Sequence, residues 1–128
     1  MKQHSPRFLA LTGDARHHVK EVSNDGVVQK LKEKHPMVLI DVREKFEYDQ
    51  GSIPGAIHLS KGLIERDIEK HINDTHTEIV LFCQGGYRSL LAAYNIQKMG
   101  YANVSSMAGG FSGWLASGHT ITKPQSDD

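Results

Sequence analysis

Short apolar runs alternate with amphipathic stretches along most of the chain. The segments Met37–Val42 and Glu78–Cys83 are almost continuously apolar, which is the pattern of strands buried on both faces of a sheet. Weaker runs predict three further strands, at Lys20–Val22, Ala56–Leu59 and Asn103–Met107. We therefore expect one sheet with the two strongly apolar segments at its centre.

Apolar residues at helical spacing occupy the gaps between these strands. Isoleucine recurs every fourth residue among charges in Gly62–Ile72, which predicts an amphipathic helix. A second helix is predicted over Arg88–Met99, because the glycine that follows is a common helix end. Shorter helices are predicted in Ser23–Pro36, over Glu44–Asp49 and through Phe111–Leu115. This alternation is typical of an α/β domain with a central, mostly parallel sheet.

The two ends of the chain lack this pattern. Residues 1–18 are basic, bear histidines and show little periodicity, and residues 119–128 form a polar segment. We expect a flexible N-terminal arm over residues 1–18 and a C-terminal tail over residues 119–128. A chain of 128 residues is long enough for one domain of ordinary size, which we expect between these two ends.

Charge and hydropathy exclude several classes of function. The 15 Lys and Arg residues balance the 15 Asp and Glu residues, so no basic patch favours binding to nucleic acid or to an anionic membrane. The apolar runs are too short to span a bilayer or to form a secretory signal. We expect a cytoplasmic protein in which the single cysteine, Cys83, stays reduced.

Eight histidines raise the question of a metal site. They stand at positions 4, 17, 18, 35, 58, 71, 76 and 119. No two are separated by two, three or four positions, the spacings that bring ligands together on a strand or helix. The sequence therefore predicts no metal site, and nothing in it indicates a cofactor.

Cys83 is the strongest candidate for chemistry. It ends a predicted buried strand and precedes Gly85, Gly86 and the helix that begins near Arg88. Ligands of open α/β sheets bind at the carboxyl ends of strands, and two glycines let successive backbone N–H groups turn inward as an anion-holding nest. Such surroundings favour the thiolate, which is the nucleophilic form. The alternative is a cysteine that only fills the core, as most free cysteines do.

Three motifs resemble those of one family. The segment Cys83-Gln84-Gly85-Gly86-Tyr87-Arg88-Ser89 is similar to the active loop C-x-x-G-x-R-S of rhodanese-type sulfurtransferases. The stretches 39–57 and 107–114 are similar to the family's first and last signatures, in the same order. The resemblance implies one rhodanese-like domain over residues 19–118, with a three-layer α/β/α fold and a sheet of about five strands.

The resemblance also implies a mechanism. Cys83 would take the outer sulfur of a donor such as thiosulfate or a persulfide, hold it as a cysteine persulfide, and pass it to cyanide or a thiol. The substrate would be held by the loop residues Gln84, Gly85, Gly86, Tyr87, Arg88 and Ser89. Implied partners are small sulfur donors and acceptors, or a protein in either role.

The pair Gly109-Gly110 indicates close backbone packing beside this loop.

Two other functions remain open at this point. Related phosphatases and arsenate reductases place five residues between the cysteine and the arginine, whereas four stand between Cys83 and Arg88 here, which favours sulfur transfer. Asp41 is a possible general acid for a phosphatase, but a structural role, bonding loop N–H groups or an arginine, is favoured. Asp41 and Arg43 are thus candidate supporting residues. The second alternative is a non-catalytic sulfur-carrier or partner-docking module, with the basic arm as its docking segment.

Three residues depart from the two-domain thiosulfate enzymes of the family. Those enzymes tend to carry basic residues in the loop and an arginine in the helix after the first motif, whereas this chain has Gln84, Tyr87 and Glu47. Arg88 and backbone dipoles would then bind a dianion nearly alone. We therefore expect thiosulfate to bind weakly and a protein or low-molecular-weight persulfide to be the donor.

Overall fold

The computed structural model describes residues 3–124. Within them, five strands form a sheet: β1 (Lys20–Val22), β2 (Val38–Asp41), β3 (Ile57–His58), β4 (Ile79–Phe82) and β5 (Val104–Met107). The helices are α1 (Pro6–Arg16), α2 (Asn24–Lys32), α3 (Lys45–Gln50), α4 (Ile64–His71), α5 (Arg88–Lys98) and α6 (Gly110–Ala116).

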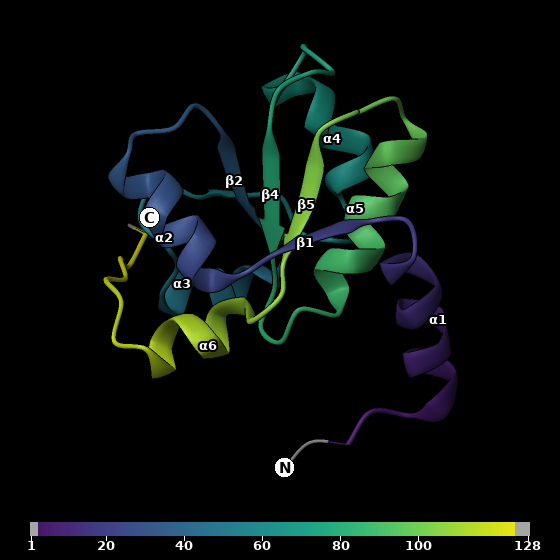
Figure 1. Ribbon diagram of the computed structural model, residues 1–128, viewed down its shortest axis with the longest axis horizontal. Helices are drawn as coiled ribbons and strands as arrows, with labels where there is room; N and C mark the ends of the chain where they lie inside the picture. The colour runs from purple at the N-terminus through teal and green to yellow at the C-terminus, as the bar shows by residue number, and fades with distance from the viewer. Residues whose placement is uncertain (1–2, 125–128) are drawn as a thin grey trace.

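The sheet is parallel throughout, with the strand order β1-β5-β4-β2-β3 (Figure 1). The two strongly apolar segments form β2 and β4 side by side, with Ile40 opposite Leu81. All four residues of β4 are buried, because helices cover both of its faces. The prediction of a parallel sheet with these strands at its centre is confirmed.

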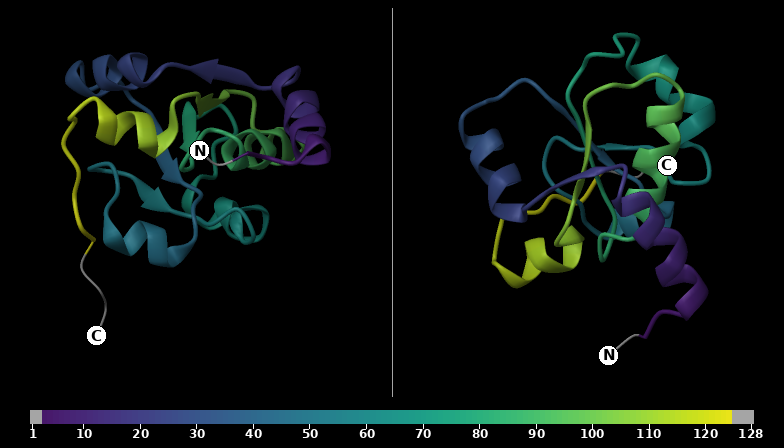
Figure 2. Two further views of the ribbon diagram at one scale, coloured as in Figure 1. Left: turned by 90° about the horizontal axis from the view of Figure 1, so that it is seen from below. Right: turned by 45° about the vertical axis from the view of Figure 1, so that its right-hand side comes forward.

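Helices lie on both faces of the sheet (Figures 1 and 2). One core, on the side of α1, α4 and α5, contains Leu81, Ile68 and Ile96. The other, on the side of α2 and α6, contains Phe82 and Trp114. Alternate residues of β4 thus enter opposite cores, as the period of a strand requires. The three-layer α/β/α fold is confirmed.

The N-terminal segment differs from the prediction. Residues 6–16 form helix α1, whose buried residues are Thr12 and Ala15. Its start is set by local chemistry, because the Ser5 hydroxyl accepts a hydrogen bond from the Phe8 N–H at 3.2 Å and Pro6 occupies the first turn. The prediction of a flexible arm over residues 1–18 did not include this helix.

The first part of the predicted C-terminal tail is bonded to the domain. Ser52 and Thr122 form an antiparallel bridge, with N–H to oxygen distances of 2.8 and 2.9 Å, and the Trp114 indole N–H donates to the Thr120 carbonyl at 2.8 Å. Residues 125–128 of the tail lie outside the described residues. Within residues 3–124, no helix has the length and apolar character needed to cross a bilayer.

Candidate active site

Cys83 lies at the carboxyl end of β4, where the chain turns into the loop that leads to α5. Its side chain is 1% exposed and forms the floor of a pocket of about 610 Å³. Strand β4 holds this position firmly because it is paired on both sides and buried in both cores. The thiol is therefore on a rigid element and still borders open space.

Backbone N–H groups of the loop point at the thiol sulfur. The Gly86 N–H donates to Cys83 Sγ at 3.1 Å and the Ser89 N–H at 3.4 Å. The Ser89 hydroxyl is also 3.4 Å from the sulfur and 2.7 Å from the hydroxyl of Ser106 on β5. Two backbone N–H groups of the loop thus converge on this one sulfur atom, and donors placed in this way stabilise negative charge.

Two glycines allow the loop to fold this tightly. Gly86 has φ of 92°, and a Cβ there would lie 2.5 Å from the Ala108 carbonyl oxygen. A Cβ on Gly110, which has φ of 61°, would clash with the Gln84 carbonyl oxygen. The first turn of α6 also holds the loop, because the Phe111 N–H donates to the Cys83 carbonyl at 2.8 Å. The predicted close backbone packing is confirmed at Gly110, whereas Gly109 packs against the Asn24 side chain.

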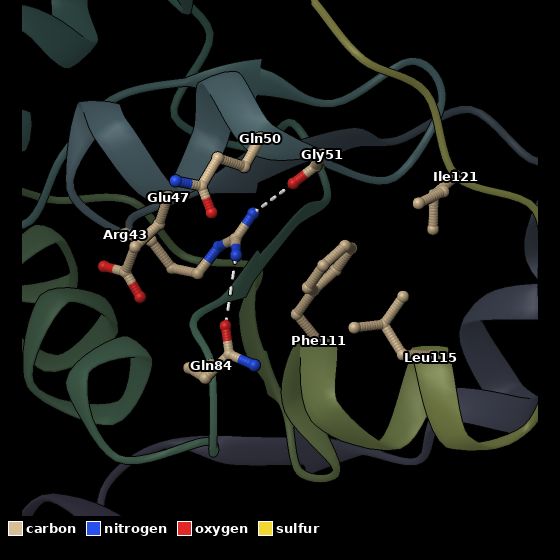
Figure 3. A pocket seen from close by; sticks show the side chains of 8 residues that line it. All are labelled: Arg43, Glu47, Gln50, Gly51, Gln84, Phe111, Leu115 and Ile121. Carbon is tan, nitrogen blue, oxygen red and sulfur yellow. Dashed lines mark hydrogen bonds between the residues drawn. The ribbon is translucent and has the colours of Figure 1, made fainter.

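Arg43 braces the loop from behind, where it borders a second pocket of about 370 Å³ (Figure 3). Its guanidinium donates to the Gln84 side-chain oxygen at 3.1 Å and to the Gly51 carbonyl at 2.6 Å. It also lies over the Phe111 ring, 4.2 Å from the ring centre. One buried cation thus connects the loop, the turn after α3 and helix α6.

Asp41 balances this buried charge. Its carboxylate accepts hydrogen bonds from the Arg43 guanidinium at 2.9 Å, the Arg43 N–H at 3.0 Å and the Ser52 hydroxyl at 2.8 Å. Asp41 is fully buried and does not line the pocket above Cys83. These contacts match the structural role predicted for Asp41, not that of a general acid.

Arg88 lines the pocket, but its guanidinium is engaged by a carboxylate. Nη1 and Nη2 donate to the two carboxylate oxygens of Glu47 on α3, at 2.8 and 3.1 Å. This bidentate pair lowers the pKa of Glu47 from its ordinary 4.5 and raises the pKa of Arg88. Arg88 therefore faces the pocket as half of an ion pair.

The family of the chain is shown by comparison. The model of the family described as "Rhodanese-like domain" matches residues 24–117, which span α2 to α6 and include the whole loop. The chain belongs to this family.

Two relatives of this rhodanese-like domain carry sulfur-related names. A sulfurtransferase of Allochromatium vinosum is 30% identical over 107 residues, 84% of this chain and 98% of that protein. The putative sulfur carrier protein YrkF of Bacillus subtilis is 32% identical over 75% of this chain, which spans about half (51%) of that protein.

One solved structure is that of a Rhodopseudomonas palustris protein of unknown function, described as a possible tyrosine phosphatase. It is 27% identical with a TM-score of 0.80, and the match covers 95% of this chain and 99% of that one.

The rhodanese-like domain brings most of the predicted site residues to one place. The pocket is lined by five of them: Cys83, Gln84, Gly85, Tyr87 and Arg88. Gly86 and Ser89 are buried and do not line it, and Asp41 and Arg43 lie behind the loop. Within the described residues, no group of three or more His, Cys, Asp or Glu side chains is arranged to hold a metal ion.

Six other residues that line the pocket were not predicted as site residues: His4, Phe8, Glu44, Phe46, Glu47 and Ser112. Glu47 comes from α3, while His4 and Phe8 come from the N-terminal segment and α1, before the residues that the family model matches. A sequence signal for α1 was present, since Ser5-Pro6 is typical of a helix start. No local pattern indicates that this helix brings two rings to Cys83.

Proposed function

We propose that the protein is a sulfurtransferase that moves sulfane sulfur from thiosulfate or a persulfide to cyanide or a thiol through a persulfide on Cys83. One observation carries the proposal: the sulfur of Cys83 accepts hydrogen bonds from the N–H groups of Gly86 and Ser89, and Cys83 lines an open pocket. The sulfurtransferase family of the chain supports it.

The reaction has two half-reactions in which Cys83 is the nucleophile and then the leaving group. The Cys83 thiolate attacks the outer sulfur of thiosulfate, the sulfur–sulfur bond of the donor breaks, and sulfite leaves with the electron pair. Cyanide or a thiolate then attacks the outer sulfur of the persulfide, which gives thiocyanate or a new persulfide and restores the thiolate. This order predicts ping-pong kinetics.

The loop supports each charged state of this cycle. The N–H groups that point at Cys83 are fixed by Gly86 and α6 before substrate arrives, so they need no reorganisation during the reaction. Cys83 is the only cysteine of the chain, so the acceptor thiol must come from outside it. A thiol nucleophile acts only while reduced, and we therefore propose a reducing compartment such as the cytoplasm.

Intact-mass measurement tests this proposal. The protein incubated with thiosulfate or glutathione persulfide should gain one sulfur atom, and cyanide should remove it. Cys83→Ser is the matched control and should gain none. A Cys83→Ser protein that still gains the sulfur, or a wild type that gains none from either donor, would refute the role of Cys83.

The same experiment separates the alternatives. A carrier module, the function named for the YrkF relative, predicts a loaded Cys83 that transfers to no small acceptor. A phosphatase predicts hydrolysis of an aryl phosphate, which the pocket disfavours because Glu44 and Glu47 line it and Arg88 is already paired. Absence of hydrolysis at high enzyme concentration, with sulfur loading intact, would exclude the phosphatase.

A further inference from the structure

Three aromatic rings form one wall of the Cys83 pocket. The ring centre of Tyr87 lies 4.5 Å from that of His4 and 5.9 Å from that of Phe8, and the His4 and Phe8 centres are 5.1 Å apart. All three residues line the pocket. We call this group, His4, Phe8 and Tyr87, the ring wall. Its spacings are those of favourable aromatic pairs.

The ring wall combines two distant parts of the chain. Tyr87 belongs to the active loop, whereas Phe8 lies on α1 and His4 directly precedes the Ser5 cap of that helix. Helix α1 lies beside α5 (Figure 1), and its buried Ala15 belongs to the core on that side of the sheet. The segment before α1 reaches the loop between β4 and α5, where His4 contacts Tyr87. The position of α1 thus determines the shape of the pocket above Cys83.

A fourth ring borders the pocket from another element. Phe46, on α3, is 67% exposed and lines the same pocket. An exposed phenyl group at the rim of a pocket loses contact with water when an apolar group enters. The pocket therefore offers apolar surface from α1, from the active loop and from α3.

The charges of the pocket do not favour a small dianion. Among the described residues that line it, Arg88 is the only lysine or arginine, and its guanidinium pairs with Glu47. Glu44 adds a second carboxylate to the lining. A sulfonate group such as that of thiosulfate would meet two carboxylates and no unpaired guanidinium, which costs electrostatic free energy.

We propose that the ring wall is a specificity subsite for the organic group R of a thiol or persulfide, and that helix α1 contributes Phe8 to it. This inference rests on the proposed sulfurtransferase function. The outer sulfur of the Cys83 persulfide passes to a thiolate RS⁻, which leaves as RSS⁻ and restores the Cys83 thiolate, while the group R packs against Phe8 and Tyr87. Cyanide has no such group and makes no use of the wall.

Acceptor kinetics on the full chain test the inference. Cys83 is loaded with excess thiosulfate, and kcat/KM is measured for cyanide, 2-mercaptoethanol and benzyl mercaptan. The wild type should prefer benzyl mercaptan over 2-mercaptoethanol. Phe8→Ala should lower kcat/KM for benzyl mercaptan about fivefold, as expected for the loss of one ring contact, and leave cyanide within about twofold.

Matched variants keep the test decisive. Leu11 lies on the same helix, is 57% exposed and does not line the pocket, so Leu11→Ala should change neither rate. Phe8→Leu keeps an apolar side chain without a ring and should lower kcat/KM for benzyl mercaptan by an intermediate amount. This variant replaces Phe8→Ala in the test if Phe8→Ala does not fold. The inference would be overturned if the Phe8 variants lost kcat/KM equally for cyanide and benzyl mercaptan, or lost none. It would also be overturned if the wild type showed no preference between the two thiols. A wild type that never gains sulfur would instead overturn the proposed function.

Discussion

At the scale of single residues, the ion pair between Glu47 and Arg88 decides what charge the pocket presents. Arg88 belongs to the loop motif, and the sequence alone predicts that its guanidinium is available to an anion. In the structure both nitrogens of the fork bond to one carboxylate 41 positions away. The net effect is a pocket whose anion-holding groups are mainly backbone N–H groups around Cys83.

This pair predicts a pH-dependent contribution to stability. The pKa of Glu47 lies below its ordinary 4.5 because the Arg88 guanidinium bonds the carboxylate. A carboxyl group with a lowered pKa in the folded state stabilises the fold above its ordinary pKa, and this stabilisation is lost as the pH falls through the folded-state value. The wild type should therefore be more stable than Glu47→Gln at neutral pH, and the difference should shrink below about pH 4.5. Urea unfolding at several pH values measures it, and a constant difference would contradict the assignment.

Gly86 gives a second prediction at this scale. An alanine there combines φ of 92° with a Cβ 2.5 Å from the Ala108 carbonyl oxygen. Gly86→Ala should cost about 1–3 kcal/mol of unfolding free energy and slow sulfur loading of Cys83 by about 100-fold, since the loop N–H groups must move. Urea unfolding and the intact-mass time course measure these two effects.

The neighbouring glycine is the control for this variant. A Cβ on Gly85 would meet only the Tyr87 ring, at 3.7 Å. The unfolding free energy of Gly85→Ala should therefore change by less than about 0.5 kcal/mol. Equal destabilisation by the two variants would contradict the assignment of the loop's conformation to Gly86.

The sequence predicts the loop well because its contacts are local. Cys83, Gly86 and Ser89 are close in the chain, so a motif of seven residues contains the thiol and the donors that face it. Glu47 and Phe8 reach the pocket through the positions of α3 and α1, which no local pattern encodes. Their roles depend on tertiary packing and became evident only in the structure.

At the scale of elements, burial on both faces made β2 and β4 predictable. A strand covered by two layers must be apolar at nearly every position, so the runs before Asp41 and Cys83 are strong signals. Helix α1 gave a weak signal because its buried residues are Thr12 and Ala15, both small, and its leucines at positions 9 and 11 are exposed. A helix that docks through small side chains lacks the apolar stripe by which helices are recognised.

Gly13 offers a direct test of helix α1. It lies inside the helix, and a Cβ there would meet no atom within 4 Å. Gly13→Ala should raise the unfolding free energy by about 0.5–1 kcal/mol, because alanine loses less backbone entropy in a helix. Gly118, with φ of 73° and equally open surroundings, is the contrast: Gly118→Ala should be destabilising. A neutral Gly13→Ala in thermal and urea unfolding would argue against the helix.

At the scale of the whole molecule, Arg43 connects parts of the chain that are far apart in sequence. Its guanidinium bonds Asp41 at the end of β2, the Gly51 carbonyl and the Gln84 side chain, and it lies over Phe111. Both Arg43 and Asp41 are buried, so removal of one leaves the other charge without its partner. The architecture behind the active loop therefore depends on one ion pair.

Arg43→Ala should accordingly cost about 3–5 kcal/mol of unfolding free energy, as expected when a buried pair loses one member. Arg66 provides the comparison, because its guanidinium pairs with Asp67 while 67% exposed. Arg66→Ala should change the unfolding free energy far less than Arg43→Ala, because water screens an exposed pair. Urea unfolding of both variants measures the difference. Similar losses of unfolding free energy would contradict the assignment of a stabilising buried ion pair to Arg43.

The strand order also determines when the sheet is completed during synthesis. Strand β1 is the first to leave the ribosome, yet its partner in the sheet is β5, the last strand. Until β5 has emerged, the chain holds β1 without a neighbour and β4 with one edge open, although all of β4 is apolar. Closure must wait for Val104–Met107, so β1 stays without its partner while the three strands between them are synthesised.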